Sequence, residues 1–154
     1  AQRRMAGWQA ELEARGLEAT PPMRGDWGAE SGYRSGLEFD AGASSAVFVA
    51  NDQMALGFMR ALQERGISVP EDVSVIGVDD QPEAAYFLPP LTTIRQDFRS
   101  MGRSCIDRLL RQIPGAPSES AAGTAAGPGA HAAAVRDGMP APKLIVRSST
   151  ASPR

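Results

Sequence analysis

The chain has 154 residues and a formal net charge of −2, a length that suits a single domain. All but one of its 16 basic residues are arginine. They are scattered along the sequence, which argues against a DNA-binding surface on this chain. No apolar run reaches the roughly 18 residues of a membrane span, and no signal peptide is visible. The single cysteine excludes an internal disulfide and fits a cytoplasmic location.

Two helices are predicted ahead of the first strand. Residues 2–15 place Met5, Trp8 and Leu12 on one helical face. Residues 29–41 have a weaker helical pattern, because three glycines within it or just after it leave its ends poorly marked. Those glycines are Gly32, Gly36 and Gly42.

The middle of the chain predicts two strands separated by its strongest helix. Residues 46–50 form the first strand, and residues 73–78 form the second, whose nearly unbroken apolar run suits a sheet covered on both faces. Residues 52–65 form the helix between them, and Gly66 ends it. Four apolar residues recur at the i, i+3, i+4, i+7 spacing of a buried helical face, namely Ala55, Phe58, Met59 and Leu62.

The next part of the chain predicts a strand followed by a second amphipathic helix. Residues 92–95 are extended, and residues 97–113 form the helix. Its apolar residues are expected to face inward, and these are Phe98, Met101, Cys105, Ile106, Leu109, Leu110 and Ile113. Cys105 is therefore interpreted as a core residue rather than a reactive thiol.

Residues 114–142 differ in composition from the rest of the chain. Of these 29 residues, 22 are Ala, Gly, Pro or Ser, which bury too little apolar surface to offset the entropy of ordering. We therefore expect a low-complexity, flexible loop. Residues 143–150 then supply a final strand of the core, centred on residues 144–147, and residues 151–154 form a tail.

Strands that alternate with helices predict an α/β fold with a parallel, doubly wound sheet. In such sheets, ligands bind at the carboxyl ends of the strands. Asn51 and Asp52 follow one buried strand, and Asp79 and Asp80 end the other, so both polar pairs are expected to face one crevice. Two structural alternatives stay open, since Asn51 or Asp52 could cap the following helix and Asp79-Asp80 could form a turn.

Catalytic and metal-binding motifs are missing from the sequence. It contains no G-x-S-x-G, phosphate-loop, G-x-G-x-x-G or C-x-x-C pattern. His131 is the single histidine, and no spacing of Cys, His or Asp around it suggests a metal site. We therefore predict no enzyme activity, no cofactor and no metal, while an α/β enzyme that uses Asp79 or Asp80 as a base is kept as a rival hypothesis.

Several stretches of the sequence resemble the C-terminal part of the LacI/GalR-type transcriptional repressors. They read RRMAGW, GDW, VFVANDQMALGFMRALQERGISVPEDVSVIGVDD and LPPLTTIRQDFRSMGRSCIDRLL, and LIVRSST is similar to the last strand of that family. Order and spacing agree over residues 1–113, whereas residues 114–142 do not match well and look like an expanded loop.

The resemblance implies a periplasmic-binding-protein-like fold, of which this chain holds an incomplete C-terminal lobe. Residues 1–113 would form a partial sugar- or effector-binding core, and the helix at residues 97–113 would belong to the other lobe. The helix-turn-helix, the hinge helix and most of the N-terminal lobe would lie elsewhere in a longer protein. Operator DNA would then be bound only through that helix-turn-helix.

The resemblance also implies a set of ligand contacts, which are Arg4, Trp27, Asn51, Asp79, Gln96 and Phe98. Arg4 would donate to sugar hydroxyls, Asp79 would accept from them, and Asn51 would do both. The two aromatic residues would line the apolar side of the sugar, and the glutamine would add a polar contact at the lobe crossover. Asp52 keeps the helix cap as its expected role. Without the resemblance, Arg4 would be a solvated helix charge and Trp27 a packed surface residue.

The implied function is effector binding and dimerisation within a DNA-binding repressor, where a sugar closes two lobes and changes operator affinity allosterically. Tyr86 and Phe87 fall in the segment similar to the family's dimer interface, so a homodimer through the C-terminal lobe is expected. The alternative is a transport-type sugar-binding protein of the same fold. The upstream sequence would distinguish the two, because a helix-turn-helix indicates a repressor and a signal peptide indicates a transport component.

Overall fold

The computed structural model describes residues 2–18, 20–113 and 141–152 of the chain. It divides into two compact units, one formed by Ala1–Ile94 with Leu144–Arg154 and the other by Arg95–Lys143. The segment predicted from its composition to be a flexible loop lies outside the described residues from position 114 to position 140. None of the described helices is both long and apolar enough to cross a membrane.

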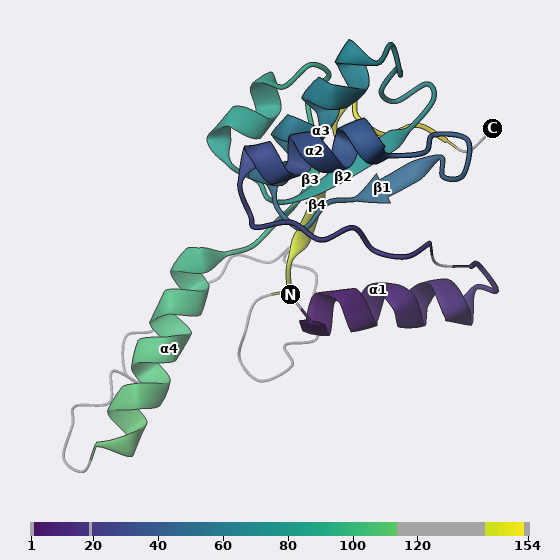
Figure 1. Ribbon diagram of the computed structural model, residues 1–154. Coiled ribbons are helices and arrows are strands. Elements are labelled where there is room, and N and C mark those ends of the chain that lie inside the picture. The colour runs from purple at the N-terminus through teal and green to yellow at the C-terminus, as the bar shows by residue number, and fades with distance from the viewer. Residues whose placement is uncertain (1, 19, 114–140, 153–154) are drawn as a thin grey trace. The chain divides into compact units, whose positions relative to one another are not determined.

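The elements follow the predicted order (Figure 1). In chain order they are α1 (Gln2–Ala14), α2 (Ala29–Glu38), β1 (Ala46–Phe48), α3 (Asp52–Glu64), β2 (Ser74–Asp79), the 3₁₀ helix η1 (Pro82–Tyr86), β3 (Thr92–Arg95), α4 (Phe98–Gln112) and β4 (Lys143–Ile145). The sheet has the strand order β1-β2-β3-β4, and β1 pairs with β2 in parallel. Parallel pairing dominates this mixed sheet, which confirms the predicted α/β class.

The core lies between α3 and the sheet. All four residues predicted for the inward face of α3 are buried, and Phe58 meets Phe39 in an edge-to-face contact with ring centroids 5.3 Å apart. On β2, Val75 and Gly77 are buried on one face, whereas on the other face Ile76 is half-buried and Val78 is buried, so the first face is covered more completely.

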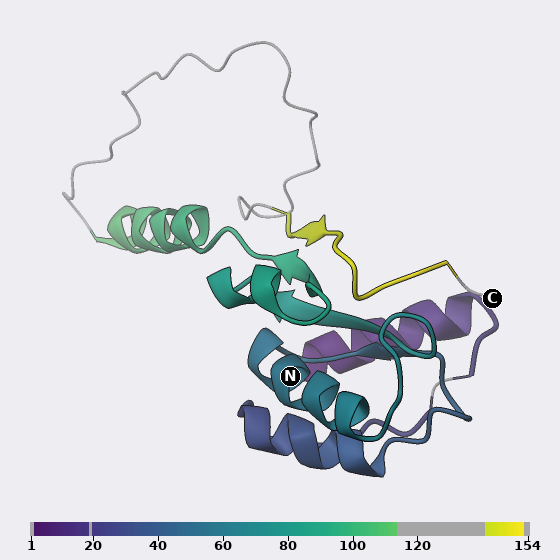
Figure 2. The ribbon, with the colours of Figure 1, turned by 90° about the horizontal axis from the view of Figure 1, so that it is seen from above.

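Gly32, one of the glycines that weaken the predicted pattern of residues 29–41, has a packing role together with Gly57 of α3. A Cβ atom added to Gly32 would lie 2.0 Å from the carbonyl oxygen of Met54, and one added to Gly57 would lie 1.8 Å from that of Ala29. Helices α2 and α3 therefore pack backbone against backbone. Figure 2 shows them side by side, with α3 next to the sheet.

The C-terminal segment joins the sheet through Ser149, which is fully buried. Its hydroxyl donates to the carbonyl of Val75 at 2.6 Å and accepts from the backbone N–H of Thr92 at 2.8 Å. One side chain thereby joins β2 to β3. The regular strand of this segment, β4, covers Lys143–Ile145.

Helix α4 belongs to the second unit. Asp97 caps it, since its carboxylate accepts the backbone N–H of Ser100 at 2.9 Å. None of the residues of α4 is buried, and Phe98, Ile106 and Leu109 are each more than half exposed. The interpretation of Cys105 as a core residue is therefore wrong for this chain, because the apolar face of its helix buries nothing and the thiol is exposed.

Candidate ligand site

Asn51 caps α3 directly after β1. Its side-chain oxygen accepts the backbone N–H of Met54 at 2.9 Å, and its amide nitrogen donates to the carbonyl of Trp27 at 3.0 Å. An amide has two N–H donors and two acceptor lone pairs, so the two bonds that fix Asn51 leave a donor and a lone pair for further contacts. Capping and ligand binding are therefore compatible for this side chain.

Asp52 does not cap the helix, so that expectation is wrong. The residue is fully buried, and its carboxylate accepts the backbone N–H of Gln81 at 2.8 Å and the hydroxyl of Thr93 at 2.6 Å. As the first residue of α3, it points its side chain towards Thr93 of β3 and Gly77 of β2. Burial raises the pKa of Asp52 above 3.8, against the two hydrogen bonds that lower it, and the charges of Asp79 and Asp80 raise it further.

The strand register brings Asn51 and Asp79 to the same edge of the sheet. Phe48 of β1 lies opposite Ile76 of β2, 28 positions further along the chain (76 − 48). Carried three residues further, the same offset places Asn51 opposite Asp79. Both residues therefore stand at the carboxyl ends of neighbouring parallel strands, as the ligand-site prediction requires.

Asp79 and Asp80 have different environments. Asp80 is only 4% exposed at its side chain and pairs with Arg147, which is 18% exposed, at 2.6 Å. Arg147 also donates to the carbonyl of Leu91 at 2.7 Å. Asp80 is thus held in a structural ion pair, whereas Asp79 is half-buried at the sheet edge. Both aspartates have positive φ angles, 109° for Asp79 and 54° for Asp80, so the chain leaves the extended conformation of β2 at these two residues.

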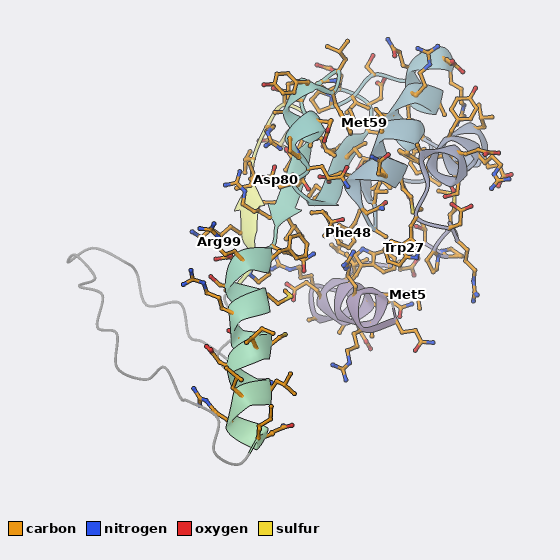
Figure 3. All side chains as sticks on the ribbon, turned by 90° about the vertical axis from the view of Figure 1, so that its left-hand side faces the viewer. Met5, Trp27, Phe48, Met59, Asp80 and Arg99 are labelled. Carbon is orange, nitrogen blue, oxygen red and sulfur yellow. The ribbon has the colours of Figure 1, made fainter. Side chains whose placement is uncertain are left out.

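Two more predicted contacts reach the same edge. The guanidinium of Arg4, from α1, donates to the carbonyl of Ala50, the residue before Asn51. Trp27 presents its carbonyl to Asn51 and is 48% exposed. We call these four residues, Arg4, Trp27, Asn51 and Asp79, the edge site. Figure 3 labels Trp27 and shows the segments that carry the side chains.

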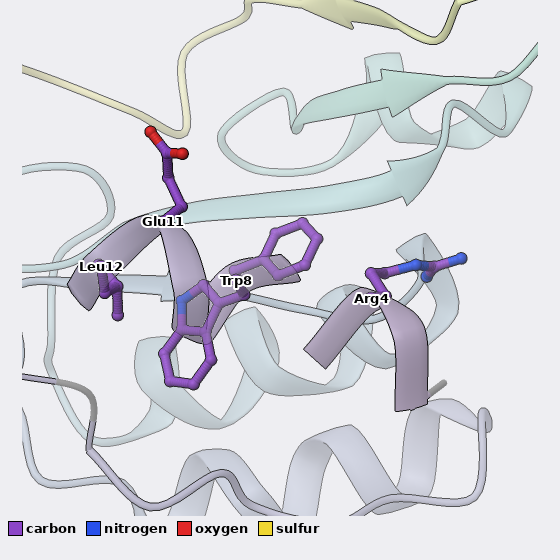
Figure 4. Close-up of a pocket in the computed structure, with 5 residues that line it drawn as sticks. Arg4, Trp8, Glu11 and Leu12 are labelled. Atoms are coloured by element: carbon purple, nitrogen blue, oxygen red, sulfur yellow. The ribbon is translucent and has the colours of Figure 1, made fainter. Parts of the chain in front are cut away.

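A shallow groove of about 270 Å³ runs along α1 beside β1, and its lining residues are Arg4, Trp8, Glu11, Leu12 and Phe48 (Figure 4). Arg4 therefore belongs both to this groove and to the edge site. Trp8 and Glu11 were not predicted as site residues. Trp8 was assigned to an apolar helix face, and nothing in the sequence indicated that this face would stay partly open.

The remaining two predicted contacts, Gln96 and Phe98, belong to the second unit. Gln96 is half-buried, and its carbonyl accepts the backbone N–H of Phe98 at 3.0 Å. Phe98 opens α4 and exposes 56% of its surface. Four of the six predicted ligand contacts thus lie in one unit and two in the other.

The residues predicted for a dimer interface lie at the end of η1, where Tyr86 is its last residue and Phe87 follows it. Tyr86 is 85% exposed, whereas Phe87 is half-buried against the core. Leu88 beside them is also strongly exposed. The segment therefore presents apolar side chains at the surface, and its role in dimerisation stays a prediction.

Among the residues that the structure describes, no three His, Cys, Asp or Glu side chains are placed to hold a metal ion. His131 lies outside the described residues. The edge site can bind a ligand through hydrogen bonds from its guanidinium, amide and carboxylate groups and through contact with its indole ring.

Comparison with known proteins gives consistent matches. The family profile described as periplasmic binding protein-like domain matches residues 1–150. The lactose operon repressor of Escherichia coli (strain K12) is 43% identical over 114 residues, which cover 73% of this chain and 32% of that protein. The transcriptional regulator MalR of Streptomyces coelicolor is 40% identical over 108 residues, which cover 70% of this chain and 27% of that protein.

A solved structure shows the same fold. The lac repressor dimer bound to operator and the anti-inducer ONPF matches with a TM-score of 0.77 at 35% identity, covering 99% of this chain and 48% of that one. The chain spans about a third of the length of the curated relatives it matches. These relatives are regulators of transcription and not enzymes.

Proposed function

This chain belongs to the family of periplasmic binding protein-like domains, and from that premise we propose that it forms the sugar-binding part of a DNA-binding transcriptional repressor. The observation that carries the proposal is the edge site. Arg4 donates to the carbonyl of Ala50 and Asn51 donates to that of Trp27, just after β1, and Asp79 stands at the end of the adjacent strand.

The side chains of the edge site suit a sugar. A guanidinium donates to two neighbouring hydroxyls at once, and a carboxylate accepts hydroxyl protons in charge-assisted bonds. The remaining N–H and lone pair of Asn51 match a hydroxyl, which both donates and accepts. The exposed ring of Trp27 offers a surface for the apolar face of a pyranose. Gln96 and Phe98, which lie in the second unit, stay predicted ligand contacts.

The regulatory step follows from binding between two lobes. A sugar shifts the equilibrium between lobe arrangements only by its difference in affinity for them. In a homodimer joined through Tyr86 and Phe87, that shift would move the segments leading to the DNA-binding domains and change operator affinity. The complete protein would act in the cytoplasm, where repressor and operator meet.

The test uses the complete gene product that carries this chain, with o-nitrophenyl β-galactoside as the first sugar in a panel of galactosides and other sugars. We expect Asp79→Ala to weaken binding, measured by isothermal titration calorimetry, by about tenfold or more, because a hydrogen bond to a charged group contributes about 1.5–3 kcal/mol. A loss of less than about twofold would show that Asp79 does not bind the sugar.

The matched control is Asp72→Ala. Asp72 also accepts a backbone N–H, that of Ser68 at 2.8 Å, but it lies in the loop that leads into β2 at the opposite end of the strand. This variant should bind sugar like the wild type. If no sugar of the panel binds the wild-type protein, the proposed function is wrong.

A further inference from the structure

We infer that Asp52 is a positioning residue of the sugar site, whose buried carboxylate holds the turn after β2 so that Asp79 faces the ligand. This inference rests on the proposed function, since it concerns the same site. It assigns a role to a residue that the sequence had placed as a helix cap and that does not itself reach the edge of the sheet.

Both oxygens of Asp52 hold the residues that follow Asp79. One oxygen accepts the backbone N–H of Gln81 directly at 2.8 Å. The other accepts the hydroxyl of Thr93 at 2.6 Å, and the same hydroxyl oxygen accepts the backbone N–H of Asp80 at 3.4 Å. Two consecutive N–H groups are therefore fixed by one carboxylate, one of them directly and one through Thr93.

The turn needs such a restraint because its backbone is unfavourable for residues with a side chain. Asp79 has φ 109° and Asp80 has φ 54°, both in the region that glycine adopts far more readily. Such conformations persist only where the surroundings determine them, and they cluster at ligand sites. The direction of the Asp79 side chain depends on its own φ, so the bonds that fix the turn also fix the carboxylate.

The packing around Asp52 shows that the fold makes room for this carboxylate. A Cβ atom on Gly77 of β2 would lie 2.3 Å from Oδ1 of Asp52, so the absence of a side chain at Gly77 leaves space for the Asp52 carboxylate against the strand. A fully buried carboxylate close to two further aspartates is costly unless it is well hydrogen-bonded. Accepting a hydrogen bond on each of two oxygens calls for a carboxylate, because an amide of the same shape has only one acceptor oxygen.

Asn51 and Asp52 therefore serve the two halves of the site from adjacent positions. The Asn51 amide fixes the carbonyl of Trp27, and the Asp52 carboxylate fixes the turn that carries Asp79. One dipeptide at the start of α3 sets the distance between the residues on either side of the ligand.

The test measures o-nitrophenyl β-galactoside binding to the complete gene product by calorimetry. We expect Asp52→Ala to weaken binding by about tenfold, the scale of one charged hydrogen bond. Asp52→Asn keeps one acceptor oxygen for the N–H of Gln81, so it should recover part of this loss. In an Asp79→Ala background, Asp52→Ala should have less than about a twofold effect, because residues that act through one another are not additive.

The outcomes separate this inference from the proposed function. If Asp79→Ala weakens binding while Asp52→Ala leaves it within about twofold, the positioning role is wrong and the proposed function stands. An equal loss from Asp52→Ala with and without Asp79 would mean a general structural role and would also overturn the inference. If Asp79→Ala has no effect, the proposed function fails first.

Two further variants keep the test decisive if Asp52→Ala does not fold. Thr93→Val removes the hydroxyl that links Asp52 to Asp80 while preserving shape, and Asp52→Asn keeps volume. Both should weaken binding at least about threefold, and both effects should vanish in the Asp79→Ala background. If both variants are folded and bind like the wild type, the inference is wrong. Asp72→Ala is the control for loss of a carboxylate at the other end of β2.

Discussion

The ion pair between Arg147 and Asp80 allows a direct test of what burial adds to a charge contact. Its N···O distance is 2.6 Å, and that of the surface pair between Arg60 and Glu64 is 2.7 Å. Arg147 is 18% exposed and Asp80 4%, against 63% for Arg60 and 39% for Glu64. The two pairs therefore share chemistry and distance and differ in their access to water.

Replacing each arginine by methionine keeps most of the apolar stem and removes the charge. Removing one partner of a buried pair typically costs about 3–5 kcal/mol, because the other charge stays buried without compensation. Arg147→Met also removes the bond to the Leu91 carbonyl. Water and salt already screen the Arg60 pair, so Arg60→Met should change little.

The assay is urea unfolding of the complete gene product, followed by circular dichroism. With a slope of about 1–3 kcal/mol per molar urea, a loss of about 3 kcal/mol lowers the midpoint by at least about 1 M. Adding Asp80→Asn to Arg147→Met should recover part of the loss, since it removes the buried charge. Equal midpoints for Arg147→Met and Arg60→Met would refute the argument from burial.

Three further outcomes are expected. Gly57→Ala should destabilise by about 1–3 kcal/mol in urea melts, because its Cβ collides with a backbone carbonyl, whereas Gly102→Ala, with open space, should be neutral or stabilising. Burial raises the pKa of Asp52 above 3.8, so the stability due to its protonated form is lost as pH rises from 3.8 through the raised pKa of the folded protein. Asp52→Asn should therefore gain on the wild type in urea melts over that range, and a pH-independent difference would contradict this. The 154-residue chain alone should bind a hydrophobic dye and melt without cooperativity, because Ile106 and Leu109 are exposed; a two-state melt of a monomer would disprove it.

The sequence predicted the helices and strands well where their periodicity was strong. The face of α3 and the polar ends of β1 and β2 were correct, because apolar spacing and strand order depend on local patterns. The resemblance to LacI/GalR-type repressors is confirmed by the family match and the relatives. The division of roles between Asn51 and Asp52 was not predictable, because either side chain can cap a helix and only the packing against β2 decides between them.

The long-range contacts could not be predicted from the sequence, for a physical reason. Arg147 pairs with Asp80 across 67 positions, and a low-complexity segment lies between them, so no local pattern relates the two. The wrong prediction for Cys105 has a different cause, because here a local pattern was present. Its helix carries a correct amphipathic pattern, but the pattern says only that a partner surface is needed and not that this chain supplies one.

The glycine contact between α2 and α3 has a mechanical consequence. Where side chains separate two helices, rotamer changes absorb a small displacement of one of them. At Gly32 and Gly57, carbonyl oxygens press directly on the opposite backbone, and no rotamer is available to yield. Asn51 starts α3 and also holds the carbonyl of Trp27, just ahead of α2. A shift of Asn51 would therefore be passed to both helices through backbone contact, because no side-chain rotamer lies between them to take it up.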